Sequence, residues 1–150
     1  MGDIDTIERT REIGRQLTER WCIPKGGDVE PFFELFSDDA ICETMVKKEL
    51  FPELGGRMTK QEFKDYVYAE SRVTELKVWV TGITAEANRV AVEAASDMSV
   101  GKNIYQNVYH WLFEIKNGKV VHARFYLDTL LARKFVDWVQ EAGGDMQTRK

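Results

Sequence analysis

The sequence predicts an α+β fold in which helices come first and an antiparallel sheet follows. The first half of the 150-residue chain has helical periodicity, with polar breaks between the helical stretches. The second half holds four stretches rich in valine, isoleucine and aromatic residues, joined by short polar turns. Short turns join antiparallel strands, and helices segregated from strands along the chain are typical of the α+β class.

Two helices are expected at the start of the chain. The first covers residues 3 to about 21, because its apolar residues fall near one stripe: Ile4, Ile7, Ile13, Leu17 and Trp21. A short second helix follows the break "IPKGGD", with Pro31 in its first turn. The side chains expected to point inward from it are those of Val29, Phe32, Phe33 and Phe36.

Two further helices are expected later in the chain. Thr59 and Glu62 have the spacing of a capping box, so a third helix begins there and carries Phe63, Tyr66 and Val67. The closing helix is "TLLARKFVDWVQEA", which ends at a pair of glycines. The segment "SDDAICETM" is expected to be a turn that leads into a short strand.

The four strand candidates are residues 75–86, 88–100, 103–116 and 119–128. Between the last two, Asn117-Gly118 favours a two-residue type I′ turn that pairs Lys116 with Lys119. Counting outward from this turn predicts the pairs Phe113–His122, Trp111–Arg124, Tyr109–Tyr126 and Asn107–Asp128. One face of the hairpin would then end in a polar-aromatic cluster of Tyr105, Asn107, Tyr109, Tyr126 and Asp128.

Asp128 has two interpretations. It follows the last strand and precedes a helix, so its carboxylate can simply cap that helix. Alternatively it lies in a half-apolar cleft, where loss of hydration raises its pKa and makes it a working acid or base.

Composition and charge exclude several classes of protein. A net charge of -4 argues against nucleic acid or an anionic membrane as the main partner, and no apolar run approaches the length of a membrane span. The start of the chain is acidic and polar, unlike a signal peptide, and Cys22 and Cys42 have no CxxC spacing, so a cytoplasmic location is expected. His110 and His122 fall on opposite faces of the predicted hairpin, and no metal-binding motif is present.

The run "VAVEAASDMSVGKNIYQNVYHWLFEIKNGKVVHARFYLDT", together with the order of the elements, resembles the SnoaL-like polyketide cyclase and ketosteroid isomerase-like branch of the nuclear transport factor two superfamily. The resemblance extends from "FFELFSDDA" through "LGGRMTKQEF" to the last strand. It implies a single domain, residues 1–150, built as a cone-shaped barrel whose curved sheet wraps helices around a deep apolar pocket. It also implies a homodimer through the outer face of the sheet, and catalysis by a pocket carboxylate without metal or cofactor.

The resemblance also assigns roles to residues. Asp128 matches the aspartate that ends the family's last strand, which is catalytic in the cyclases and in limonene epoxide hydrolase. Glu93 falls where that hydrolase has its second catalytic carboxylate, but Ala91 stands where it has an arginine. The register of Glu93 is open, since a two-residue turn at Gly101-Lys102 would place it opposite His110 on the outer face, and an odd-length loop would turn it into the pocket.

We therefore predict an acid/base enzyme without cofactor or metal, which acts on a small apolar substrate by proton transfer leading to isomerisation, cyclisation or elimination. Asp128 and Glu93 are the predicted titratable groups, and Asn107, Tyr109 and Tyr105 would hold the polar end of the substrate. The remaining residues expected to bind the substrate are Tyr126, Trp111, Tyr66, Trp79, Met45 and Phe63. The alternatives are a non-catalytic ligand-binding or dimerisation module of the same fold, and an epoxide hydrolase of the limonene type.

Overall fold

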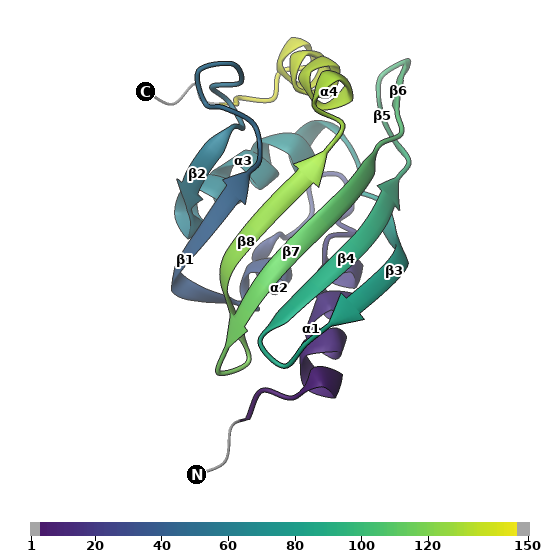
Figure 1. Ribbon diagram of the computed structural model, residues 1–150. Coiled ribbons are helices and arrows are strands. Elements are labelled where there is room, and N and C mark those ends of the chain that lie inside the picture. Colours follow the sequence, from purple (N-terminus) through teal and green to yellow (C-terminus); the bar gives the residue numbers. More distant parts are fainter. Residues whose placement is uncertain (1–3, 147–150) are drawn as a thin grey trace.

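A curved six-stranded sheet forms the frame of the protein (Figure 1). The computed structural model describes residues 4–146. The strand order is β2-β1-β8-β7-β4-β3, and all neighbours pair antiparallel except β1 and β8, which are parallel. The strands of this sheet are β1 (Phe36–Thr44), β2 (Gly56–Thr59), β3 (Val78–Ala85), β4 (Arg89–Ser96), β7 (Val108–Lys116) and β8 (Lys119–Leu127).

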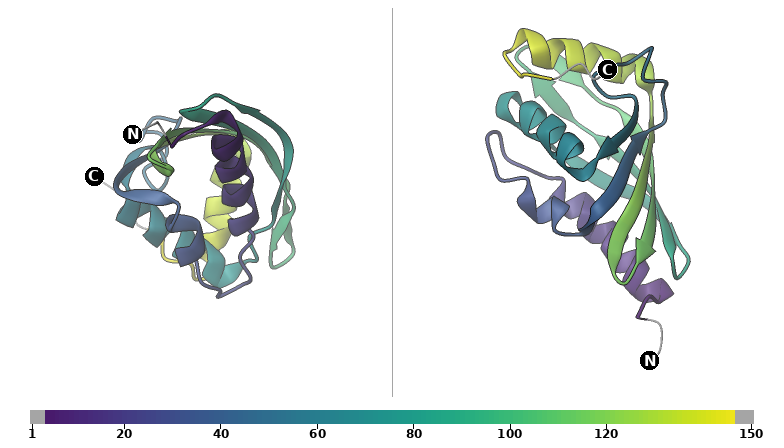
Figure 2. Two further views of the ribbon diagram at one scale, coloured as in Figure 1. Left: turned by 90° about the horizontal axis from the view of Figure 1, so that it is seen from below. Right: turned by 90° about the vertical axis from the view of Figure 1, so that its left-hand side faces the viewer.

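Within the described residues, four helices complete the fold: α1 (Ile7–Arg20), α2 (Glu30–Phe33), α3 (Lys60–Val73) and α4 (Thr129–Glu141). The sheet curves around α1, and α4 lies across one end of the sheet beside the short strands β5 (Met98–Val100) and β6 (Asn103–Tyr105) (Figure 2). This arrangement confirms the predicted α+β class with a curved sheet around helices. None of the helices in residues 4–146 is long and apolar enough to cross a membrane.

Helix α1 begins at Ile7, after the N-cap Thr6, whose hydroxyl accepts the N–H of Arg9 at 3.2 Å. The predicted start at residue 3 lies outside the described residues. The predicted stripe is wrong at its beginning, since Ile4 and Ile7 are exposed. The buried residues of the helix are Thr10, Gly14, Leu17 and Thr18.

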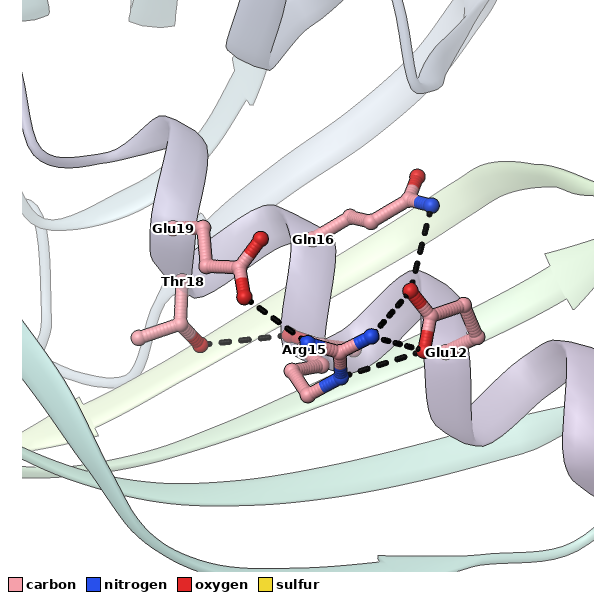
Figure 3. Close-up of polar contacts among 6 residues, drawn as sticks. Glu12, Arg15, Gln16, Thr18 and Glu19 are labelled. Carbon is pink, nitrogen blue, oxygen red and sulfur yellow. Dashed lines mark hydrogen bonds and ion pairs between the residues drawn. The ribbon is translucent and has the colours of Figure 1, made fainter.

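The glycine explains this buried face, because it lets the helix lie close to β4. A Cβ atom at Gly14 would be 2.8 Å from Cγ2 of Val90 and 3.2 Å from Cγ2 of Val92. On the outward side, Arg15 bonds Glu12 at 2.5 Å and Glu19 at 2.9 Å (Figure 3). These ion pairs are exposed to solvent. They form the polar face of the helix and contribute little to the stability of the fold.

The next elements follow the prediction with two corrections. The segment "SDDAICETM" is not a turn before a short strand, because residues 37–44 all belong to the nine-residue strand β1. Helix α2 has Pro31 in its first turn but ends at Phe33, so Phe36 belongs to β1 and not to the helix. The capping box of α3 is confirmed, since Thr59 and Glu62 exchange hydrogen bonds of 2.9 and 3.1 Å.

Two of the predicted strands are each divided in the structure. The stretch 88–100 forms β4 and β5, and the stretch 103–116 forms β6 and β7. The breaks fall at Asp97 and at residues 106–107. Among the strands of residues 4–146, β5 and β6 pair only with each other, as a two-stranded arm beyond the main sheet.

The hairpin of β7 and β8 has the predicted turn. Lys116 pairs with Lys119, and Asn117 and Gly118 have φ values of 52° and 75°. Positive φ at both central residues is what a type I′ turn requires.

Just beyond the turn, a β-bulge shifts the register, so the pairs predicted further out are wrong. Ile115 pairs with Val120 but Glu114 pairs with His122, which leaves Val121 as the extra residue of β8. Every later side chain of β8 therefore changes face relative to β7. The observed pairs are Glu114–His122, Phe113–Ala123, Leu112–Arg124, Trp111–Phe125, His110–Tyr126 and Tyr109–Leu127.

The bulge is favoured because it buries the apolar residues of β8. Ala123 and Phe125 lie in the core, where the uninterrupted register would have placed Arg124. Burying these apolar side chains stabilises the fold more than regular pairing of the one bulged residue would. The predicted contact between Trp111 and Arg124 is therefore absent, and Arg124 instead pairs with Glu114 at 3.2 Å on the outer face.

Candidate functional site

A cavity of about 60 Å³ lies between the inner face of the sheet and helices α3 and α4. Its wall is mainly aromatic, with side chains from the end of α1, from α3, from β7 and β8, and from α4: Trp21, Phe63, Tyr66, Trp111, Phe125 and Phe135. The wall also contains four side chains that carry polar groups: Thr44, Glu70, Tyr105 and Tyr109. An apolar wall with a few convergent polar groups is the usual form of a small-molecule site.

Glu70 places a carboxyl group in this wall. It lies on α3 beyond Tyr66, its side chain is 5% exposed, and its Oε1 atom has no hydrogen-bond partner among the described residues. Burial raises the pKa of Glu70 to about 8. At neutral pH the group is therefore mostly an uncharged carboxylic acid, and it loses its proton slightly above neutrality.

Three tyrosines surround the same cavity and stay protonated. Burial raises the pKa of Tyr66 and of Tyr109 well above the ordinary value, and raises that of Tyr105 to about 12. The hydrogen bonds that Tyr105 accepts from Tyr109 and Asn107 act in the opposite direction, and the charges of Glu70 and Asp128 raise its pKa further. These phenols can donate hydrogen bonds but cannot act as bases near neutral pH.

A buried hydrogen-bond network joins two of the tyrosines to the end of the sheet. The hydroxyl of Ser96 lies 2.8 Å from that of Tyr109, which donates to Tyr105 at 3.3 Å. Asn107 donates from Nδ2 to the Tyr105 oxygen at 2.7 Å and to the carbonyl of Asp128 at 3.1 Å. The network fixes the tyrosine hydroxyls at one end of the cavity.

The cavity wall carries no basic side chain within the part of the chain that the structure describes. Arg133 influences the pKa of Tyr66, but its guanidinium is bonded to Glu53 at 2.5 and 3.1 Å and to Asp137 at 2.8 Å. It also lies over the ring of Phe51, 4.3 Å from the ring centre. Residues 4–146 hold no cluster of His, Cys, Asp and Glu that could bind a metal. The wall is therefore suited to an uncharged organic molecule.

Comparison of the whole structure with solved structures identifies the fold. An NTF2-like protein from Anabaena variabilis ATCC 29413 superposes with a TM-score of 0.66 over 85% of this chain and 94% of that chain, at 16% identity. The chain has the NTF2-like fold. No family model and no curated protein matches the sequence, so the fold alone is shared.

Two enzymes have the same NTF2-like fold. BvnE pinacolase from Penicillium brevicompactum superposes with a TM-score of 0.73, at 10% identity, over 95% of this chain and 98% of that chain. An LEH-like epoxide hydrolase from M.tuberculosis superposes with a TM-score of 0.66, at 15% identity, over 90% of this chain and 94% of that chain.

Within this NTF2-like fold, five of the predicted substrate-contacting residues line the cavity. They are Phe63, Tyr66, Tyr105, Tyr109 and Trp111. Asn107 is buried but is not on the wall, and it acts on the cavity through its bond to Tyr105.

Asp128 is the N-cap of α4 and is exposed. Its carboxylate accepts the N–H groups of Leu130 and Leu131 at 3.0 and 3.1 Å, so the capping interpretation is confirmed. The carboxylate lies outside the cavity wall, because the amide of Asn107 binds the backbone of Asp128 and its side chain turns to the helix. Within residues 4–146 the Asp128 carboxylate is therefore exposed and does not lie in the half-apolar cleft expected for it.

Glu93 lies on the outer face, opposite His110, and its carboxylate lies over Gly82. Of the two registers left open for Glu93, the structure has the one that places it opposite His110 on the outer face, and the residues of β4 that point inward are its neighbours Val92 and Ala94.

Three of the residues predicted to contact a substrate lie outside this cavity wall. Tyr126 is 42% exposed because the bulge in β8 turns it outward, and Trp79 is 46% exposed on the same outer face. Met45 is 39% exposed just after β1 and does not line the cavity.

Glu70 and Ser96 were not among the residues predicted from the sequence. The signal for Glu70 was the spacing of α3, since residue 70 continues the stripe of Phe63, Tyr66 and Val67. A carboxylate on a buried helical stripe is rare enough to indicate a site. For Ser96 the signal was the alternation of β4, in which Val92, Ala94 and Ser96 point inward.

Proposed function

We propose that this protein is an enzyme that moves a proton at a carbon atom next to a carbonyl group in a small uncharged molecule. Glu70 would carry the proton. The observation that supports this role is the buried, unpaired Glu70 carboxyl in an aromatic cavity. A raised pKa near neutrality is what a general acid or base requires.

The reaction uses only groups that line the cavity. The ionised Glu70 takes the proton from the carbon, so the C–H bond breaks and an O–H bond forms on the carboxyl. The electron pair moves into a new carbon–carbon double bond, and the carbonyl oxygen becomes an enolate that accepts a hydrogen bond from Tyr105. Return of the proton to another carbon gives isomerisation, and loss of a leaving group gives elimination. The two enzymes of the same fold support a role in small-molecule chemistry.

The proposed role of Glu70 can be tested by hydrogen exchange, with cyclopentanone as the probe. In D₂O the enzyme should exchange the hydrogens next to the carbonyl for deuterium faster than buffer does, as followed by NMR. Because the base is the ionised form of Glu70, the rate should rise with pH and level off above about 8. Glu70→Gln should lower the exchange rate by about 100-fold or more, the usual loss for a general base.

Matched controls separate Glu70 from the exposed carboxylates. Asp128→Asn keeps a residue that caps helices well, and Glu93→Gln changes an outer-face residue, so both should retain the exchange rate within about twofold. Loss of exchange in Asp128→Asn with retention in Glu70→Gln would overturn the proposal. No exchange by the wild type would favour a non-catalytic binding module.

We also propose that the chain forms a homodimer through the outer face of the sheet. Trp79, Ala95 and Val108 lie side by side on β3, β4 and β7, and Trp79 and Val108 are exposed. Contiguous exposed apolar side chains are typical of an interface. Sedimentation should give twice the chain mass for the wild type and for Leu50→Glu, a change at an exposed residue of the β1–β2 loop. Trp79→Glu should give the mass of one chain, and a wild-type monomer would contradict the proposal.

A further inference from the structure

We propose that Ser96 and Asn107 are positioning residues that direct the hydroxyl hydrogen of Tyr105 into the cavity, where it binds the carbonyl oxygen of an uncharged ligand. This inference deepens the proposed function, on which it rests for the reaction itself. It assigns the group that holds the substrate's oxygen and the two residues that orient this group.

The oxygen of Tyr105 already accepts two hydrogen bonds. One comes from Nδ2 of Asn107 at 2.7 Å and the other from the hydroxyl of Tyr109 at 3.3 Å. A phenol oxygen has two acceptor positions and one hydrogen. With both acceptor positions in use, what Tyr105 still offers is its hydrogen, and Tyr105 lines the cavity.

Ser96 sets the direction of the chain of hydroxyls. Its oxygen accepts the backbone N–H of Asn107 at 3.1 Å, and its hydroxyl is buried next to that of Tyr109. If Ser96 donates to Tyr109, then Tyr109 donates to Tyr105, and the hydrogen left without an acceptor among the described residues is that of Tyr105, which lines the cavity and can reach a ligand there. In the reverse direction the hydrogen left over would be that of Ser96, which is buried and does not line the cavity, so no ligand could accept it and the cost of an unpaired buried donor would remain.

Asn107 is held in one orientation by its other partners. Its Oδ1 accepts the N–H of Val108 at 2.7 Å and that of Asp128 at 3.3 Å, so the oxygen side of the amide is fixed by two backbone donors. The NH₂ side must then face Tyr105 and the Asp128 carbonyl. A flipped amide would lose all four bonds.

The surroundings of Tyr105 indicate the class of ligand. Its ring stacks on Phe135, with 4.1 Å between ring centres, and the rest of the wall is largely aromatic and carries no basic side chain within residues 4–146. A hydrogen-bond donor in such surroundings selects a neutral acceptor over an anion, because an anion would lose its hydration without gaining a counter-charge. A small ketone or aldehyde with an otherwise apolar body meets these conditions.

The test is the infrared carbonyl band of cyclopentanone bound to the protein at pH 6. The wild type should show one band at lower frequency than cyclopentanone in hexane, because a hydrogen bond weakens the C=O bond. Tyr105→Phe should return the band to the hexane position and weaken binding about tenfold, since about 1.4 kcal/mol is a typical loss for one hydrogen bond.

Variants of Ser96 and Asn107 test whether these residues orient the Tyr105 hydroxyl. Ser96→Ala should give two bands, because the tyrosine hydroxyls can then point either way, and Ser96→Thr should restore the single band, because threonine keeps the hydroxyl. Asn107→Asp replaces the donor beside Tyr105 by an acceptor, which draws the hydrogen away from the ligand and removes the shifted band. If that variant does not fold, the two Ser96 variants decide.

Three results would overturn the inference: a shifted band in Tyr105→Phe, identical bands in wild type and Ser96→Ala, or no saturable binding of cyclopentanone. The measurement needs no turnover. Glu70→Gln should keep the shifted band whether or not the wild type exchanges hydrogens, so this inference and the proposed function can fail separately.

Discussion

Replacing Glu70 by glutamine is expected to stabilise the folded protein at pH 8, by as much as about 5 kcal/mol, while it removes the proposed activity. Glutamine has nearly the shape of glutamate but carries no charge at any pH. The buried Glu70 has its pKa raised to about 8 from an ordinary value of 4.5, because burial disfavours the charged form.

The direction in which stability changes with pH follows from the number of protons bound to the folded and to the unfolded chain. Between pH 4.5 and 8 the unfolded chain has lost the Glu70 proton and the folded chain still holds it. Stability therefore falls as the pH rises through this range, and the loss is complete above the folded-state pKa. Glutamine at position 70 removes this loss.

Urea denaturation of wild type and Glu70→Gln at pH 5 and at pH 8 measures the effect. The difference in free energy of unfolding should be small at pH 5 and several kcal/mol at pH 8. Glu93→Gln, at an exposed position, should show nearly the same small difference at both pH values. A Glu70→Gln difference that does not change with pH would mean that Glu70 titrates as an ordinary glutamate in the fold.

Enlarging Gly14 should be the most damaging substitution on α1. Gly14→Leu should destabilise the protein by about 3 kcal/mol, because a Cβ atom alone would already lie 2.8 Å from Val90. The longer side chain would push α1 away from β4 and open the apolar layer between them. The midpoint of urea denaturation measures this loss.

The matched control is Arg11→Leu, on the exposed side of the same helix. It should change the free energy of unfolding by less than about 0.5 kcal/mol, as surface substitutions usually do. Equal effects of the two variants would show that leucine perturbs the helix itself, and that the close packing on β4 is unimportant.

The sequence predicted local features well where a few adjacent residues determine them. The type I′ turn depends on Asn117 and Gly118 alone, and the capping box on Thr59 and Glu62, so both were predictable. The register of β8 was not, because the bulge at Val121 depends on what the rest of the molecule buries against Ala123 and Phe125.

The candidate site shows the same division. Tyr105 and Tyr109 were predictable because the alternation of side chains along their stretch of sequence is clear, and both line the cavity. Asp128 was predicted to be catalytic because it ends a strand. At a strand-to-helix junction, the backbone N–H groups at the start of the helix are local partners for a carboxylate, and two of them bond one oxygen of Asp128. Glu70 has no such local partner, and only the buried stripe of α3 could have indicated that it matters.

The extra residue in β8 has a consequence for comparing this protein with others. Proteins of the same architecture that lack a residue equivalent to Val121 would present the alternate set of β8 side chains to their ligands. An alignment without a gap at this point would match positions from opposite sides of the sheet. One inserted residue in a strand, and not only the identity of the residues, thus determines which side chains such proteins can use to bind a ligand or react with it.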